Sequence, residues 1–184
     1  NPNIMLIGEI RDKETADIAI RAALTGHLVF STIHTNSAVE SIQRLLNIGI
    51  TAQDIASSLN IAIAQRLVRK LCPECREEFV PTTEELKYIQ ENLSQNNQES
   101  LKSPKLYKPK GCAKCSPTGF KGQLGIFEIL INDNEIQDLI SKNTPVQQID
   151  IELKKKNMIT MTQDGILKAL TGITTLNEVK RVVE

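Results

Sequence analysis

The sequence predicts an α/β protein in which a parallel sheet with crossover helices is followed by a small metal-binding module and a helical C-terminal part. Three observations support this. Short apolar runs alternate with helical patterns near the N-terminus, two C-x-x-C pairs lie in a turn-rich middle part, and helix-capping patterns recur toward the C-terminus. We therefore divide the chain into segments 1–71, 72–119 and 120–184.

The first segment begins with two strands joined by a helix. Residues 4–8 (IMLIG) form a continuous apolar run, typical of a strand buried on both faces, and residues 27–33 (HLVFSTI) form a second one. Asp12 can cap the intervening helix, and Gly26 stands where that helix ends. Strand–helix–strand order indicates two parallel strands with a crossover helix between them.

The remainder of the first segment predicts one more helix and one more strand. Ser37 and Glu40 have the spacing of a capping box in front of a helix over 39–48, and Gly49 ends that helix. Residues 60–68 (NIAIAQRLV) alternate apolar and polar side chains, which favours a strand over a helix.

The middle segment, which starts at the first cysteine, is poorer in regular structure. Thr82 and Glu85 predict the start of a short helix. Residues 91–105 are polar and predict an exposed loop. The turn-rich stretch 111–125 then leads into a strand at 125–130 (GIFEIL).

Helices are predicted for the rest of the chain, because residues suited to helix N-termini recur there. The predicted starts are Asp133 before 134–143, the pair Thr144 and Pro145 as N-cap and first-turn residue, and Thr175 with Glu178 before 179–183.

Composition limits the classes of function. The chain of 184 residues has 22 basic and 22 acidic residues and is 3% aromatic, which argues against a general nucleic-acid-binding protein. We find no run long enough to cross a membrane and no export signal, so a reducing compartment is expected. The sequence opens without an initiator Met, directly into a strand, so we expect it to be a piece of a longer chain.

Polar and charged residues follow both predicted strands. Glu9 comes directly after the first strand, and His34 follows the second. If the strands are parallel neighbours, both side chains emerge at the edge where open α/β sheets bind ligands. An acid there can bind magnesium or orient an attacking water, and a histidine can contact a terminal phosphate. The alternatives are an ordinary sheet edge for Glu9 and, for His27 after Gly26, a capping or core histidine.

Four cysteines form the pattern C-x2-C-x36-C-x2-C, through Cys72, Cys75, Cys112 and Cys115. Two such pairs can place four thiolates around one ion, and an all-cysteine tetrahedral set favours zinc. Because no coordination position stays open, the zinc would be structural rather than catalytic. The alternatives are four buried free thiols or a redox pair.

Between residues 100 and 127 the chain has lysines but no acidic residue. The simple interpretation is a solvated face, and the sharper alternative is a surface for anionic lipid or for an acidic partner. The lysines are Lys102, Lys105, Lys108, Lys110, Lys114 and Lys121.

Several ordered motifs resemble a known family. Residues 4–38 closely resemble the Walker B and histidine boxes of the bacterial secretion ATPases, which power type II secretion and type IV pilus assembly. Residues 63–75, 111–115 and 119–130 resemble the segments that follow in the zinc-containing branch. The resemblance runs over essentially the whole chain, and it implies a RecA-like ATPase core that assembles as a homo-hexamer.

The resemblance also implies roles for single residues and partners. Glu9 matches the catalytic glutamate that orients water, and His34 matches the histidine near the γ-phosphate. The matched motifs further imply ATP and Mg²⁺ as ligands, structural Zn²⁺ on the four cysteines, platform and adaptor proteins of the inner membrane as partners, and a cytoplasmic location at that membrane. The residues assigned to nucleotide binding are Gly8, Arg11, Asp12 and His27.

One family motif does not occur in these residues, namely the phosphate loop G-x-x-x-x-G-K-[ST]. The family carries that loop upstream of its Walker B strand. We therefore expect this chain to lack ATPase activity by itself. Two other hypotheses remain: a zinc-stabilised module that binds an acidic partner or nucleic acid, and a domain that docks a partner through its C-terminal helices.

Overall fold

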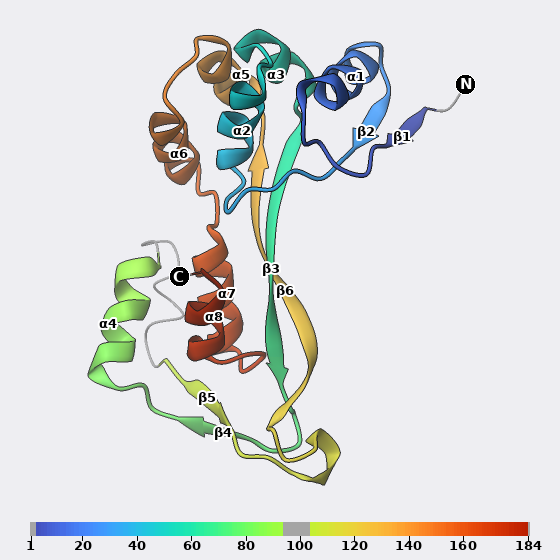
Figure 1. Cartoon of the computed structure of the whole chain (residues 1–184). Helices are drawn as coiled ribbons and strands as arrows, with labels where there is room; N and C mark the ends of the chain where they lie inside the picture. Colours follow the sequence, from blue (N-terminus) through green and yellow to red (C-terminus); the bar gives the residue numbers. More distant parts are fainter. Residues whose placement is uncertain (1–2, 94–103, 184) are drawn as a thin grey trace. The chain divides into compact units, whose positions relative to one another are not determined.

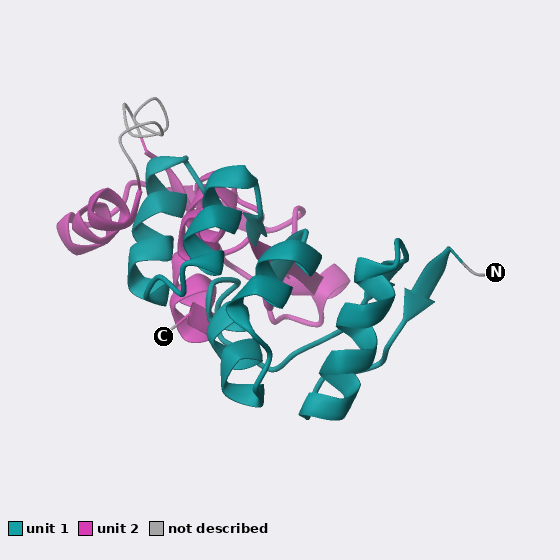
Figure 2. Cartoon of the chain, turned by 90° about the horizontal axis from the view of Figure 1, so that it is seen from above, with its two compact units in different colours: residues 1–64, 129–158 teal, residues 65–128, 159–184 magenta. Residues whose placement is uncertain are grey.

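The computed structural model describes residues 3–93 and 104–183 and has a mixed α/β fold. The chain divides into two compact units, which Figure 2 shows in two colours. Unit 1 comprises residues 1–64 and 129–158, and unit 2 comprises residues 65–128 and 159–184. Each unit thus combines two separate stretches of chain, whereas the predicted segments are continuous. The three-segment division stays a prediction.

Unit 1 begins with the predicted strand–helix–strand motif (Figure 1). Strand β1 (Ile4–Leu6) pairs in parallel with β2 (Leu28–Phe30), with Ile4 opposite Leu28 and Leu6 opposite Phe30. Helix α1 (Lys13–Leu24) is the crossover between them, and Asp12 caps it as predicted by accepting a hydrogen bond from the backbone N–H of Thr15. The parallel pair and its crossover helix are therefore confirmed. The predicted burial of both strands on both faces is wrong, since Leu6 is 80% and Phe30 54% exposed in this two-stranded sheet.

Two helices follow in unit 1. Helix α2 (Glu40–Ile48) ends at Gly49, whose φ of +100° is the left-handed conformation that favours glycine. The predicted capping box is only half formed. Ser37 Oγ accepts from the backbone N–H of Glu40, but the Glu40 carboxylate accepts from the backbone N–H of Asn36 instead of closing back on Ser37. Helix α3 (Ala52–Ser58), capped by Thr51, was not predicted.

The long strands differ from a simple parallel sheet. Strand β3 (Ile61–Leu71) pairs with β6 (Phe120–Ile131), and both are longer than predicted. Strands β4 (Arg76–Phe79) and β5 (Leu106–Pro109) form an antiparallel pair that was not predicted. The described chain thus contains a parallel pair, β1 and β2, and an antiparallel pair, β4 and β5.

Helix α4 (Thr83–Asn92) starts at the predicted Thr82–Glu85 capping box. It includes the first two residues of the loop predicted over 91–105, so that prediction is wrong at its start. Residues 94–103 of the predicted loop lie outside the described residues.

The predicted C-terminal helices are present as α5 (Asn134–Ser141), α6 (Val146–Lys155), α7 (Met161–Leu170) and α8 (Leu176–Val183). Asp133 caps α5 as expected. The start of α6 was predicted one residue early, since Pro145 rather than Thr144 is its N-cap residue. A capping box of Thr160 and Gln163 opens α7 and was not predicted. No helix among the described residues is long and apolar enough to cross a membrane.

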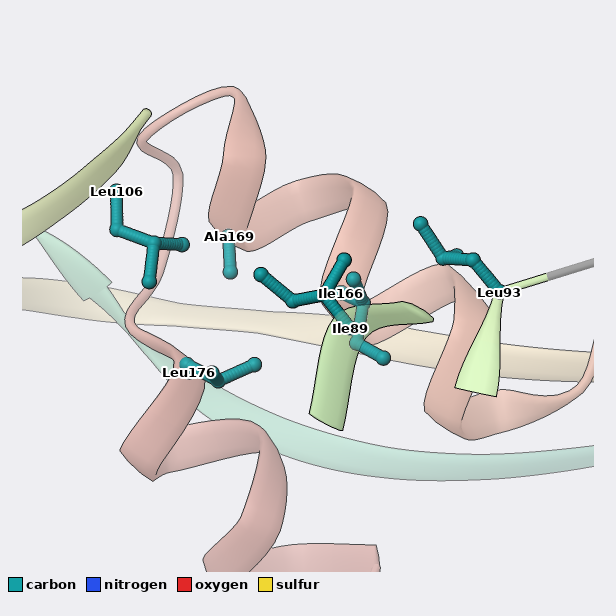
Figure 3. Close-up of a cluster of buried hydrophobic side chains, with 6 residues drawn as sticks. All are labelled: Ile89, Leu93, Leu106, Ile166, Ala169 and Leu176. Atoms are coloured by element: carbon teal, nitrogen blue, oxygen red, sulfur yellow. The ribbon is translucent and has the colours of Figure 1, made fainter. Parts of the chain in front are cut away.

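Each unit has its own aliphatic core. In unit 2, α4, β5, α7 and α8 bury one cluster (Figure 3), made of Ile89, Leu93, Leu106, Ile166, Ala169 and Leu176. In unit 1, fully buried side chains from α1, α2, α3, α5 and α6 include Ala16, Ile42, Ile55, Ile136, Ile140 and Ile149. Burial of such side chains is the main favourable contribution to folding. Helix α1, which joins β1 to β2, thus contributes to the core of unit 1 through Ala16.

Candidate functional site

The ends of β1 and β2 stay side by side beyond the strands themselves. The backbone N–H of Ile7 donates to Phe30 O at 2.9 Å, and that of Ile10 donates to Thr32 O at 2.8 Å. The hydroxyl of Thr32 in turn donates to Gly8 O at 2.8 Å. Two hydrogen bonds thus connect Thr32 to the backbone on either side of Glu9, and this brings Glu9 next to the segment that leads to His34.

Glu9 and His34 meet at this edge, as their positions after parallel strands predict. Glu9 Oε1 lies 2.6 Å from His34 Nε2. The separation is that of an ion pair, but the orientation falls outside hydrogen-bond geometry, so Oε1 is buried without a hydrogen-bond partner among the described residues. The Glu9 side chain is 22% exposed, whereas that of His34 is 86% exposed. A shielded carboxylate oxygen therefore faces a solvent-accessible ring.

The assigned nucleotide-binding residues have different environments. Arg11 Nε donates to Glu9 Oε2 at 2.6 Å and is strongly exposed. Asp12 is used as the cap of α1, and the backbone N–H of Thr15 lowers the pKa of its carboxyl. A Cβ built on Gly8 would meet no atom within 4 Å, so the space above this residue is open.

His27 lies at the other end of β2 from His34. Its Nδ1 is 3.2 Å from Ala22 O and 3.3 Å from Thr25 Oγ1, and its backbone N–H donates to Ala22 O. These contacts are made with the C-terminal end of α1, where carbonyl groups lack helical partners. They favour the capping alternative for His27, and the structure does not bring it together with Glu9.

The four cysteines converge in unit 2 although 36 residues separate the two pairs. Their sulfurs all lie within 4.8 Å of one another. The separations are 4.0 Å for Cys72 and Cys112, 3.8 Å for Cys75 and Cys115, and 3.7 Å for Cys112 and Cys115. Four thiolates at about 2.3 Å from a tetrahedral zinc ion would be about 3.8 Å apart. The donor set therefore fits a four-cysteine zinc site.

The backbone around the cysteines also suits thiolates. Cys115 Sγ accepts hydrogen bonds from the backbone N–H groups of Cys112 and Gly119. Gly119 has a φ of +75°, and a Cβ there would lie 2.3 Å from Pro109 Cβ, so only glycine fits this close approach.

Two thiols of this cluster have shifted pKa values. Burial raises the pKa of the Cys75 thiol to about 12. Burial also acts to raise the pKa of Cys115, but hydrogen bonds from Cys112 and Gly119 outweigh it and bring the pKa to about 7. Metal ions bind the deprotonated form, so binding at this cluster displaces protons.

Four of the five described lysines of the middle segment form ion pairs with acids that lie 27 to 40 positions earlier in the chain. Lys105 contacts Glu78 at 2.7 Å, and Lys110 contacts Glu77 at 2.7 Å. The antiparallel pairing of β4 with β5 produces these contacts. Lys108 pairs with Glu77 and Lys114 with Glu74, while Lys102 lies outside the described residues. This pairing favours the solvated-face interpretation.

Sequence reasoning missed two residues that hold these regions together. Thr32 was included only as part of a strand, although its hydroxyl bonds to Gly8 O. Glu178 was predicted as a capping residue, and its N–H does donate to Thr175 Oγ1. Its buried carboxylate, however, accepts hydrogen bonds from the backbone and guanidinium of Arg69. The position of Thr32, a polar residue at the end of a strand, could have indicated its contact with the neighbouring strand. No local pattern indicated that Arg69 is the partner of Glu178.

Comparisons with known protein sequences agree over the full chain. A family model described as "Type II/IV secretion system protein" matches residues 1–181. The type IV pilus assembly ATPase PilB of Pseudomonas aeruginosa is 43% identical over 184 residues, which is 100% of this chain and 31% of that protein. The type II secretion system ATPase E of Vibrio cholerae is 41% identical over 100% of this chain and 35% of its own length. The chain thus spans about a third of these relatives.

Solved structures with a similar fold include a pilus retraction motor and a bacterial ATPase. The pilus retraction motor PilT with bound ADP has a TM-score of 0.64 at 24% identity, over 98% of this chain and 39% of that one. The Legionella pneumophila ATPase DotB has a TM-score of 0.63 at 24% identity, over 100% of this chain and 39% of that one. At this identity the likeness concerns the fold alone.

Proposed function

The chain belongs to the family of type II/IV secretion system proteins, and we propose that it is part of a motor that hydrolyses ATP to drive type II secretion or type IV pilus assembly. The observation that carries the proposal is the meeting of Glu9 and His34 at the ends of two parallel strands. Ligands bind at such strand ends in open α/β sheets. The names of the relatives, which are ATPases, support the same activity.

The proposed roles follow from the chemistry of the two side chains. The shielded Oε1 of Glu9 accepts no hydrogen bond and lies 2.6 Å from His34 Nε2, so once His34 turns away this oxygen is suited to orient an attacking water and accept its proton. His34 is exposed and can turn from Glu9 toward a terminal phosphate. The open space above Gly8 lets a ligand approach the backbone closely. ATP binding further requires Mg²⁺ and a phosphate loop, which these residues do not contain.

The four cysteines are proposed to hold one structural zinc ion. The sulfur separations support this, and they leave no coordination position for a substrate. The zinc would stabilise the part of unit 2 in which β4 and β5 pair. A zinc-stabilised binding module remains the alternative function, but balanced charge and the paired lysines argue against nucleic acid as its ligand.

The remaining proposals concern assembly and location. We propose a homo-hexamer that works with inner-membrane platform and adaptor proteins at the cytoplasmic face of that membrane, as the family resemblance implies. Anionic lipid is a weaker proposal, because the described lysines contact acids of β4 and of the turn before it. We also infer that the N-terminal segment serves nucleotide chemistry while the cysteine segment serves stability or partner binding.

The proposal is tested in the full-length protein by two substitutions and a control. Glu9→Gln should keep nucleotide binding and slow hydrolysis about 100-fold or more, since an amide cannot accept the proton of water. His34→Ala should slow hydrolysis with little effect on ADP binding. Glu14→Gln, an acid in the first turn of α1, is the control and should hydrolyse ATP as the wild type does. Wild-type hydrolysis by Glu9→Gln would refute the proposal.

A further inference from the structure

Arg11 was assigned above to nucleotide binding, but its contacts in the structure are with Glu9. Arg11 Nε donates to Glu9 Oε2 at 2.6 Å, across only two positions in the chain. Arginine carries a permanent positive charge, and its planar donors favour a carboxylate in one orientation. The contact therefore determines which way the Glu9 carboxylate is turned.

The two oxygens of Glu9 are consequently unequal. Oε2 is occupied by Arg11, whereas Oε1 is shielded from solvent, lies beside His34 and has no hydrogen-bond partner among the described residues. A buried acceptor without a partner is unfavourable unless a ligand or a water fills the place. Because Oε1 accepts no hydrogen bond and only the exposed His34 ring lies against it, it becomes available to an attacking water when that ring turns away.

The backbone of this segment is held independently of Arg11. Ile10 donates to Thr32 O, and Thr32 Oγ1 donates to Gly8 O, so the chain on both sides of Glu9 is fixed by hydrogen bonds to β2. Loss of the Arg11 side chain, which is 76% exposed, would leave these bonds in place. What it would release is rotation of the Glu9 carboxylate.

We propose that Arg11 is a positioning residue that holds Oε2 of Glu9 and so presents Oε1 to the attacking water, rather than a residue that binds the nucleotide. The inference rests on the proposed function of Glu9. It assigns the guanidinium a role in hydrolysis that leaves affinity for ATP unaffected. A displacement of about 1 Å at a reacting group can lower the rate about 100-fold.

The test measures kcat, KM for magnesium ATP and binding of a non-hydrolysable ATP analogue in the full-length protein. Arg11→Gln should lower kcat about 10-fold to 100-fold and leave KM and analogue binding nearly unchanged. Arg11→Lys, which restores a cation, should recover part of kcat. Arg21→Gln, at the opposite end of α1, is the matched control and should behave as the wild type.

A double substitution separates positioning from other effects. If Arg11 acts through Glu9, then Arg11→Gln should cause no further loss of kcat once Glu9 is already Gln. Equal losses in both backgrounds, or a loss of analogue binding with unchanged kcat, would overturn the inference. A fully active Glu9→Gln protein would instead refute the proposed function, so the two failures are distinguishable.

Discussion

Glu178 offers a prediction whose magnitude can be worked out from the structure. Its carboxylate is 4% exposed and joins α8 to β3 within unit 2. Oε2 accepts from the backbone N–H of Arg69 at 3.0 Å, and the guanidinium groups of Arg69 and Arg181 donate at 2.7 and 2.8 Å. We expect Glu178→Gln to destabilise unit 2, because the amide carries no charge for these two cations.

The size of the effect follows from the pKa. Burial alone would raise the pKa of Glu178, but hydrogen bonds from Arg69 and Arg181 outweigh it and bring it from 4.5 to about 2. That difference corresponds to about 3 kcal/mol. The two arginine side chains are half-exposed, so solvent screening reduces the contribution. We expect Glu178→Gln to lower the free energy of unfolding by about 2 kcal/mol at neutral pH.

The pH dependence of this contribution has a definite sign. The folded-state pKa of Glu178 is lower than the unfolded one, so the stabilisation is complete above pH 4.5 and is lost as pH falls toward 2. The difference in unfolding free energy between wild type and Glu178→Gln should therefore shrink over this range. Acid effects shared by both proteins, including loss of metal, cancel in the comparison.

The assay is urea unfolding of this chain followed by tyrosine fluorescence. The chain has no Trp and two tyrosines, Tyr88 and Tyr107, which both belong to unit 2, so the signal reports that unit. Glu77→Gln, which removes the exposed partner of Lys110, is the matched control and should have a much smaller effect. Equal losses for both variants, or a Glu178→Gln deficit that persists unchanged at about pH 2, would refute the reasoning.

Three further predictions concern metal, membrane and activity. Cys112→Ser should abolish the binding of about one zinc ion per chain and expose unit 2 to limited proteolysis. The reason is that structural zinc contributes on the order of 10 kcal/mol to folding. A full zinc content by elemental analysis would contradict this prediction. Replacement of Lys105 and Lys110 by Gln should leave sedimentation with anionic liposomes unchanged, because these lysines already contact Glu78 and Glu77, and a loss of binding would restore the lipid proposal. This chain alone should release no phosphate from magnesium ATP in a continuous assay, since it has no phosphate loop, and sustained turnover would contradict that expectation.

Elements whose ends are marked by local hydrogen bonds could be predicted well. Asp12, Thr82 and Asp133 all cap the helices assigned to them, because a capping side chain bonds to N–H groups two or three residues away. Predictions failed where the partner of a residue is distant. The β4–β5 pair joins strands about 30 residues apart, and short charged strands carry no clear alternation of apolar and polar residues.

For the candidate site, the sequence by itself determined the residue types and their order along the chain. Two short apolar strands joined by a capped helix imply parallel neighbours, and that arrangement places Glu9 and His34 at one edge. Likewise, two C-x-x-C pairs imply four thiolates around one ion. Both inferences rest on the order of the elements and on the spacing of residues, and both can be read directly from the sequence.

Only the tertiary structure decided which side chains are paired. It placed Arg11 on one oxygen of Glu9, matched Lys105 and Lys110 with acids of β4, and brought Arg69 to Glu178 across 109 positions in the chain. Charged side chains are long and can find many partners, and the choice among them depends on burial and strand register rather than on residue type. These properties arise only when separate stretches of chain pack into one unit.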